Sequence, residues 1–332
     1  MRLAMIGAGA MGAMFGARFA RAGAEIVLYD LDEAHIAAIA ARGLRVATPD
    51  SEIDVRLPAT STVREIGSAD IAVIMVDSNA TQAAAQAAAT VLGPGGCALT
   101  LQNGIGNIET LAAELGGDRV IAGVTYNSAA KLGPGHVLHS NVDETTIGEI
   151  DGRRSERIEA VARLFRRAGL PISISNNVLG HIWMKFVLNA AINPVSAVTG
   201  LRPGEIARVP AARRLLERLL DEIMEVIEAK GLILPEGDPR AAVLDHAWER
   251  YNRPSMLQHL EQGLRTEIAA LNGALLKEAQ DLGLACPFNE AIVLTVKAMT
   301  ARAMARKAEP VLDEQALEAA ARLEPSRTIP SR

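Results

Sequence analysis

The sequence predicts an α/β fold of two domains, a parallel sheet with helices on both faces followed by an all-α domain. Short apolar runs alternate with helical periodicity through the first half of the chain. Alternation of this kind builds a parallel sheet covered on both sides. The second half is almost entirely long helical pattern, and 332 residues are comfortable for two cores. We expect the domains at 1–170 and 171–332.

In the N-terminal domain, apolar runs are the expected strands, and glycines end the helices between them. The first strand is Leu3–Ile6, and a helix over Met11–Arg21 leads to the second strand, Glu25–Tyr29. The alternation then continues with a helix over Leu31–Arg42, strands over Ile71–Val76 and Ala98–Leu101, helices over Thr81–Val91 and Ile108–Leu115, and β-type segments from Val120 to Ile150.

In the C-terminal domain, a short apolar run at Pro171–Ser175 precedes the helices. The expected helices are Asn177–Thr199, Ala211–Lys230, Ser255–Leu282 and Glu290–Ala308. The last stretch, Glu324–Arg332, is rich in Pro, Ser and Arg, and we expect it to be frayed.

Composition and charge exclude several classes of protein. The net charge is −5 with no basic block, which argues against nucleic acid as a partner. The two cysteines, Cys97 and Cys286, have no metal-ligand spacing, so we expect no metal site and a reducing compartment. Glycines interrupt the apolar N-terminus, unlike a signal peptide, and no apolar run is long enough for a membrane span. We expect a cytoplasmic protein, with the oligomeric state open and a homodimer as the assembly to consider.

A glycine-rich motif follows the first predicted strand and opens the first predicted helix. It fits the pattern G-x-G-x-x-G with Gly7, Ala8, Gly9, Ala10, Met11 and Gly12. The first glycine of such a motif permits a tight turn, the second lets the backbone approach a pyrophosphate, and the third lets helix and strand pack closely. The helix N-terminus then offers free N–H groups to the phosphates. We interpret this segment as the phosphate-binding turn of a Rossmann domain, the alternative being a glycine turn without a ligand.

Asp30 ends the second predicted strand, where a carboxylate accepts hydrogen bonds from the adenosine ribose of NAD. NADP sites commonly have a cation here for the 2′-phosphate, but Leu31, Asp32 and Glu33 follow instead. Carboxylates would repel that phosphate, so Asp30 and Leu31 favour NAD(H). The alternative is that Asp30 only caps the following helix.

A polar stripe crosses an apolar helix in the second half. Lys185, Asn189 and Asn193 are four residues apart and lie on one helix face. Burying these groups is unfavourable unless they meet partners or a ligand. Carbonyl reduction needs a proton donor beside the ketone oxygen, and a charged lysine can supply it. The alternative is a solvated helix edge with an ordinary surface lysine.

Two further residues are candidate site residues only when they are considered together with the other motifs. Ser255 is interpreted as the N-cap of the helix predicted over Ser255–Leu282, and Glu267 lies about three turns down that helix. Taken alone, neither residue indicates a site, and a surface position is the simpler interpretation of Glu267.

Together these motifs resemble the ketopantoate reductases, also called 2-dehydropantoate 2-reductases. The resemblance spans most of the chain. It rests on the Gly7–Gly12 motif, Leu101-Gln102-Asn103-Gly104, Gly133-Pro134-Gly135, Gly148-Glu149, Lys185 with Asn189 and Asn193, Ser255-Met256-Leu257-Gln258, and Thr266-Glu267.

The resemblance implies a Rossmann domain joined to an all-α domain like the C-terminal domain of 6-phosphogluconate dehydrogenase, with the substrate between them. It implies hydride transfer from NAD(P)H to the ketone of a 2-oxo acid, ketopantoate to pantoate, with NADP(H) as the usual cofactor. The roles it implies are Lys185 as catalytic acid, Glu267 as catalytic residue at the cofactor–substrate junction, Asn103 and Ala129 at the cofactor, and Asn103, Asn189, Asn193 and Ser255 at the substrate.

The chain departs from the family pattern near the expected cleft. Asp77 stands where the family has a lysine, His259 where it has an aspartate, Pro203-Gly204 where many members have Asn-Gly, and Leu31 where many have an arginine. These departures leave two alternatives open beside a ketopantoate reductase. One is an NAD-dependent D-2-hydroxy acid dehydrogenase with another substrate, and the other is a non-catalytic NAD(H)-binding regulatory protein.

Overall fold

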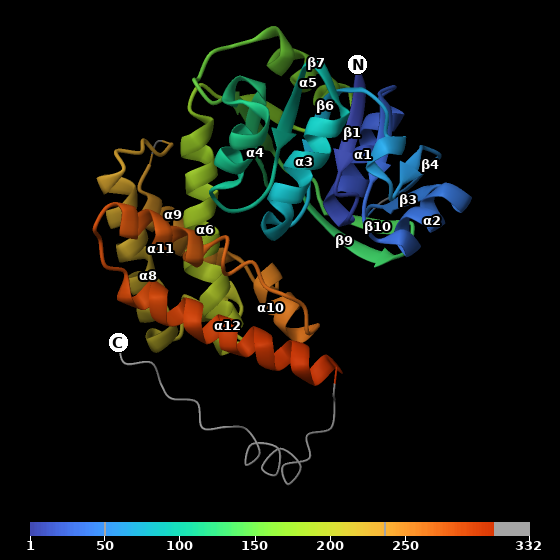
Figure 1. Cartoon of the computed structure of the whole chain (residues 1–332). Coiled ribbons are helices and arrows are strands. Elements are labelled where there is room, and N and C mark those ends of the chain that lie inside the picture. Colours follow the sequence, from blue (N-terminus) through green and yellow to red (C-terminus); the bar gives the residue numbers. More distant parts are fainter. Residues whose placement is uncertain (50, 236, 309–332) are drawn as a thin grey trace, which may run out of the picture.

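The computed structural model describes residues 1–49, 51–235 and 237–308. The first half of the chain forms a part built around a sheet, and the second half forms a helical part (Figure 1). The long helix α6 (Val178–Thr199) reaches from one part into the other (Figure 1). The stretch Glu324–Arg332, predicted to be frayed, lies outside the described residues.

The main sheet has eight strands within the described residues. In order across the sheet they are β12 (Ile172–Ile174), β11 (Thr145–Glu149), β8 (Val120–Thr125), β7 (Leu92–Thr100), β6 (Ala69–Ile74), β1 (Arg2–Ile6), β2 (Glu25–Tyr29) and β5 (Ala59–Thr60). Neighbouring strands run parallel, apart from the antiparallel pair β8 and β11. The predicted α/β class is confirmed.

Helices cover both faces of this sheet, so its strands are apolar on both sides. On one face, α1 (Ala10–Arg21) and α5 (Glu156–Arg167) bury a cluster of phenylalanine rings. On the other face, α3 (Thr81–Val91) and α4 (Asn107–Leu115) contribute to a second core rich in alanine and valine. Helix α2 (Glu33–Arg42) follows β2 along the chain.

A smaller sheet lies against α1, and two of its four strands were not predicted. Its strand order is β4 (Glu52–Val55), β3 (Leu44–Ala47), β10 (His136–Asn141) and β9 (Ser128–Gly133). The β-type segments predicted from Val120 to Ile150 therefore divide between the two sheets. Strands β3 and β4 have only four residues each, too few for their alternation of buried and exposed side chains to stand out.

Helix α6 lies at the centre of the helical part. The helices around it are α7 (Pro203–Ile206), α8 (Pro210–Ala229), α9 (Pro239–Glu249), α10 (Ser255–Glu261), α11 (Asn272–Asp281) and α12 (Pro287–Ala308). The end of the main sheet, at Ile174, and the start of α6, at Val178, lie close to the division at residue 170, which stays a prediction.

The single helix predicted over Ser255–Leu282 is wrong, because the chain leaves α10 and resumes in α11. Gly263 follows α10 with φ +63°, a left-handed conformation that a helix cannot continue. A Cβ at Gly263 would also lie 3.0 Å from the Ala303 carbonyl oxygen. Glu267 therefore lies in the connecting segment and not on the helix of Ser255.

Two further findings concern the described residues as a whole. None of their helices is both long and apolar enough to cross a lipid bilayer. They also contain no group of three or more His, Cys, Asp or Glu side chains that could hold a metal ion.

Candidate active site

The site residues of the first half follow the carboxyl ends of neighbouring strands, the edge at which open α/β sheets bind ligands. The glycine motif follows β1, Asp30 follows β2, Asp77 follows β6, Asn103 follows β7, and Tyr126 follows β8. The sheet order places β2, β1, β6, β7 and β8 side by side. Residues from five segments of the chain therefore meet at one edge.

The glycine turn has the geometry that a dinucleotide site requires. Gly7 has φ +94°, and a Cβ at Gly12 would lie only 1.9 Å from the Gly7 carbonyl oxygen. At Gly9 a Cβ would meet no described atom within 4 Å. Gly9 is also the N-cap of α1 and carries no side-chain cap, so backbone N–H groups of the first turn are available to an anion.

The acidic segment after β2 is less simple than the sequence analysis assumed. The half-buried Asp30 accepts a hydrogen bond from the Asp32 backbone N–H at 2.9 Å, and Asp32, not Asp30, caps α2. Lys131, from β9 of the smaller sheet, forms an ion pair with the Asp32 carboxylate. This hydrogen-bonded lysine lowers the pKa of Asp32. A cation therefore does reach this segment, from a strand far away in the sequence.

Lys185 projects from α6 toward the end of β8. Its Nζ donates a hydrogen bond to the Thr125 carbonyl oxygen at 2.5 Å and lies 5.5 Å from the centroid of the Tyr126 ring. Removal from water lowers the pKa of Lys185 to about 8, although the Glu267 carboxylate acts in the opposite direction. The ammonium form still predominates at neutral pH, close to the point at which it can release its proton.

Glu267 lies near Lys185, and the charges around it come from different segments. Burial and, to a smaller extent, the Asp77 carboxylate raise the pKa of Glu267 to about 7, although Lys185 and the Asn103 side chain act in the opposite direction. The Asn103 backbone is itself held, because its carbonyl oxygen accepts from Ser78 Oγ at 2.7 Å and from Asn107 Nδ2 at 2.9 Å. Lys185, Glu267, Asn103 and Asp77 thus form one electrostatically coupled group.

The remaining predicted site residues have less definite contacts. Asn189 and Asn193 are half-buried on α6, and no hydrogen bond within the described residues holds their amides. Ser255 is the exposed first residue of α10, but the N-cap of that helix is Pro254, so its interpretation as N-cap is wrong. Ala129 lies on β9, where it pairs with His139 of β10.

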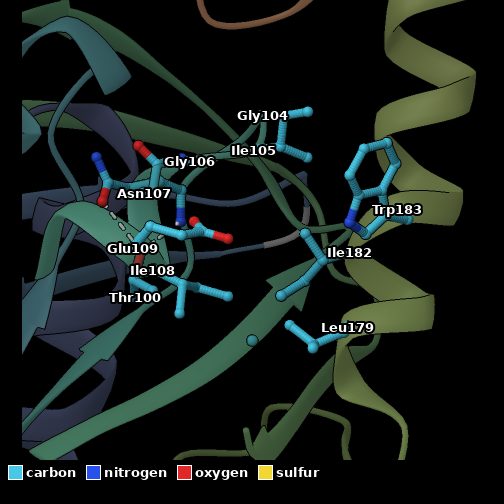
Figure 2. Close-up of a pocket in the computed structure, with 12 residues that line it drawn as sticks. Thr100, Gly104, Ile105, Gly106, Asn107, Ile108, Glu109, Leu179, Ile182 and Trp183 are labelled. Carbon is cyan, nitrogen blue, oxygen red and sulfur yellow. Dashed lines mark hydrogen bonds between the residues drawn. The ribbon is translucent and has the colours of Figure 1, made fainter. Parts of the chain in front are cut away.

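A small pocket of about 20 Å³ lies nearby, between α4 and the first turns of α6 (Figure 2). It is lined on one side by the Gly104–Glu109 segment and on the other by Leu179, Ile182 and Trp183 (Figure 2). Trp183 and Lys185 are two residues apart, about 200° around a helix, so Trp183 extends from the other side of α6 than the lysine. Its volume is enough for about one water molecule, and it is not the substrate site.

Family models match the chain at both ends. Residues 3–152 match the model described as "Ketopantoate reductase PanE/ApbA", and residues 177–300 match its C-terminal counterpart. The 2-dehydropantoate 2-reductase of Halobacterium salinarum is 33% identical over 288 residues, which cover 86% of this chain and 95% of the relative. The chain belongs to the ketopantoate reductase family. The enzyme of the same name from Archaeoglobus fulgidus is also 33% identical, over 89% of this chain and 97% of its own.

Solved structures agree with this membership. A PanE/ApbA family ketopantoate reductase from Ralstonia eutropha matches with a TM-score of 0.85 and 33% identity, covering 91% of this chain and 99% of its own. A D-mandelate dehydrogenase solved with NADH and anilino(oxo)acetate matches with a TM-score of 0.84 and 22% identity, covering 91% of this chain and 99% of its own. At that identity the match shows a shared fold. As a member of the ketopantoate reductase family, the chain is a nicotinamide-dependent oxidoreductase.

Asp77→Asn is expected to lower the pKa of Glu267 in this family member, because it removes a negative charge that raises it. A break near pH 7 in the pH profile of kcat/KM would then move to lower pH. Glu267→Gln should abolish the break, which assigns it to Glu267. Steady-state rates across the neutral range measure both effects. A break that persists in Glu267→Gln would assign it to another group.

Proposed function

We propose that this chain transfers hydride from a reduced nicotinamide cofactor to the ketone of a 2-oxo acid, with ketopantoate as the first candidate substrate. The observation that carries the proposal is the grouping of Lys185, Glu267 and Asn103 at the sheet edge that also bears the glycine turn. Membership of the ketopantoate reductase family supports the same reaction.

The glycine turn fits a nicotinamide dinucleotide. Gly9 leaves open the space that a side chain would fill, and the uncapped start of α1 suits a pyrophosphate. We assign Gly7 to Gly12 to the phosphates, Asp30 to the adenosine ribose, and Asn103, Ala129 and Glu267 to the nicotinamide half. When bound, the reduced nicotinamide supplies the hydride.

Lys185 is the proposed proton donor. Reduction of a ketone places negative charge on its oxygen, and an ammonium group beside that oxygen stabilises the charge and delivers a proton. A pKa of about 8 keeps Lys185 protonated at neutral pH while making it a stronger acid than a solvated lysine. Thr125 accepts one of its three N–H bonds, which leaves two for substrate. Asn189, Asn193 and Ser255 are the proposed donors to the substrate carboxylate and hydroxyl.

NAD(H) is the proposed preference. Asp30 lies half-buried at the end of β2, and the exposed Leu31 after it offers no charge to a 2′-phosphate. Lys131 is the cation that reaches this segment, but its ammonium is already paired with Asp32. A 2′-phosphate would have to displace that carboxylate and would still face Asp30.

The test is a comparison of kcat/KM for ketopantoate and 2-oxoisovalerate, each with NADH and NADPH. We expect reduction of ketopantoate, faster with NADH. Strict recognition of the ketopantoate hydroxyl would favour it by about four to five orders of magnitude. We expect less discrimination, because Asp77, Pro203 and His259 replace family polar groups around the cleft. Reduction of neither acid would overturn the substrate assignment, and faster turnover with NADPH would overturn the cofactor preference.

A second candidate is oxidation of a D-2-hydroxy acid with NAD at the same site. The observation that favours it is the lowered pKa of Lys185, because an amine with a pKa of about 8 can also accept a proton under mildly alkaline conditions. Oxidation of D-2-hydroxy acids at a kcat/KM above that for ketopantoate reduction would favour this candidate.

A further inference from the structure

A buried polar network adjoins Lys185, and none of its side chains has a role in the proposed hydride or proton transfer. Its first member is Thr125, whose carbonyl oxygen accepts the lysine hydrogen bond at 2.5 Å. Thr125 Oγ1 lies 2.9 Å from Thr145 Oγ1 and accepts from Asn127 Nδ2 at 3.0 Å. All three side chains are buried, so these contacts hold the Thr125 side chain, whose own backbone carbonyl accepts from Lys185.

The network continues from Asn127 to helix α1. Asn127 Oδ1 lies 3.0 Å from His139 Nε2, and His139 Nδ1 lies 3.3 Å from a guanidinium nitrogen of Arg18. The His139 ring is 0% exposed. Arg18 belongs to α1, the helix that begins at the glycine turn. A continuous path of hydrogen bonds therefore joins the cofactor-site helix to the backbone that holds Lys185.

The direction of each hydrogen bond in this path can be deduced. Arginine only donates, so His139 Nδ1 accepts and Nε2 carries the proton, which it donates to Asn127 Oδ1. The backbone of Asp143 gives an independent check on the Asn127 amide. Its N–H donates to Oδ1 at 3.3 Å, and its carbonyl accepts from Nδ2 at 2.6 Å. Both arguments give one orientation, with the amide nitrogen facing Thr125.

The charge state of the path is also constant near neutral pH. Burial and the Arg18 guanidinium lower the pKa of His139 to about 4, so the ring remains neutral. Arg21 is the further charge that faces Arg18. Lys185 faces Glu267, which in turn faces Asp77, and it lies over the Tyr126 ring. Between pH 6 and pH 9, Lys185 and Glu267 are therefore the groups that change protonation, whereas His139 stays neutral.

We propose that His139 and Asn127 are positioning residues, which orient the Thr125 carbonyl and through it the Lys185 ammonium. The role of Lys185 as proton donor belongs to the proposed function, on which this inference rests. The proton on His139 Nε2 is the side-chain contact that holds Asn127 Oδ1, beside the Asp143 backbone, and so helps to hold the donor to Thr125. We expect a group that keeps this proton to keep Lys185 in place, and a group that loses it to displace the lysine.

Two variants separate these cases. In His139→Gln, the longer side chain can place an amide NH2 where Nε2 stood and still donate to Asn127. In His139→Asn, the shorter side chain reaches only the position of Nδ1, so the donor to Asn127 is lost. Thr146→Val is the matched control, because it removes a buried hydroxyl from the same strand as Thr145, but one that pairs with Ser173.

The first readout is the pKa of Lys185, measured by trace acetylation at a series of pH values with mass spectrometry. The Thr125 carbonyl favours the charged form of the lysine, so disturbing it should lower that pKa. We expect the lower pKa in His139→Asn, and a pKa near that of the parent protein in His139→Gln and Thr146→Val. Asn127→Ala removes the amide that donates to Thr125 and should also lower the pKa of Lys185. This second variant keeps the proposal testable if His139→Asn does not fold.

The second readout is steady-state kinetics with ketopantoate. His139→Asn is expected to lower kcat by about ten- to a hundredfold, the scale of a misplaced reacting group, with little change in KM for the cofactor. An unchanged Lys185 pKa in both His139→Asn and Asn127→Ala would overturn the proposal. A lowered Lys185 pKa with unchanged kcat would support the positioning and would count instead against Lys185 as the proton donor.

Discussion

Lys185→Ala is expected to lower kcat by about two to four orders of magnitude, the range for loss of a positioned general acid. The side chain is held by the Thr125 carbonyl and lies beside Glu267, so an alanine leaves the ketone oxygen without an ammonium partner. Cofactor affinity should change little, because the phosphates are assigned to the glycine turn, on another part of the sheet edge. Steady-state turnover and cofactor titration measure the two quantities.

Lys230→Ala is the matched control for this variant. Lys230 is also a partly exposed lysine of the helical part, but it pairs with Glu278. We expect its removal to leave kcat near that of the parent protein. Turnover by Lys185→Ala close to that of Lys230→Ala would show that water or another group donates the proton.

Gly9→Ala is expected to weaken cofactor binding by about ten- to a hundredfold while leaving the fold intact. A Cβ at this position meets no described atom within 4 Å, so the free protein can accommodate it. The methyl group would instead occupy the space assigned to the pyrophosphate and displace a charge-assisted hydrogen bond, worth about 1.5–3 kcal/mol. Cofactor titration and thermal unfolding of the free protein separate the two effects.

Two other glycines provide the comparison. Gly117→Ala adds a Cβ that likewise meets no described atom within 4 Å, far from the glycine turn in sequence, and should change neither property. Gly12→Ala would place a Cβ 1.9 Å from the Gly7 carbonyl oxygen, so it should lower thermal stability as well as affinity. Unchanged cofactor affinity in Gly9→Ala would mean that the phosphates bind elsewhere.

The features that sequence predicted well are those encoded over short distances along the chain. The glycine motif, the strand that precedes it and the helix α1 that follows are neighbours, and each part supports the others. The polar stripe of Lys185, Asn189 and Asn193 could be predicted from the period of one helix alone, and all three residues lie on α6. Asn103 and Asp77 each follow a predicted strand, and the structure places both at one sheet edge.

The features that sequence missed depend on tertiary contacts. Lys131 meets Asp32 across 99 residues because β9 pairs with β10 in a sheet whose other strands were not predicted. His139 is an ordinary histidine in sequence, and its role arises only where β10 crosses α1. The break after α10 depends on Gly263 beside Ala303, and a lone glycine in a helical pattern does not reveal such a contact.

A single-turnover measurement tests the proposed hydride transfer directly. The protein is loaded with stoichiometric NADH and mixed with ketopantoate, while nicotinamide absorbance and product are followed together. We expect loss of the reduced nicotinamide with formation of an equal amount of pantoate, slowed in Lys185→Ala. Binding of NADH without oxidation by ketopantoate or other 2-oxo acids would contradict it, and would instead favour a non-catalytic NAD(H)-binding protein.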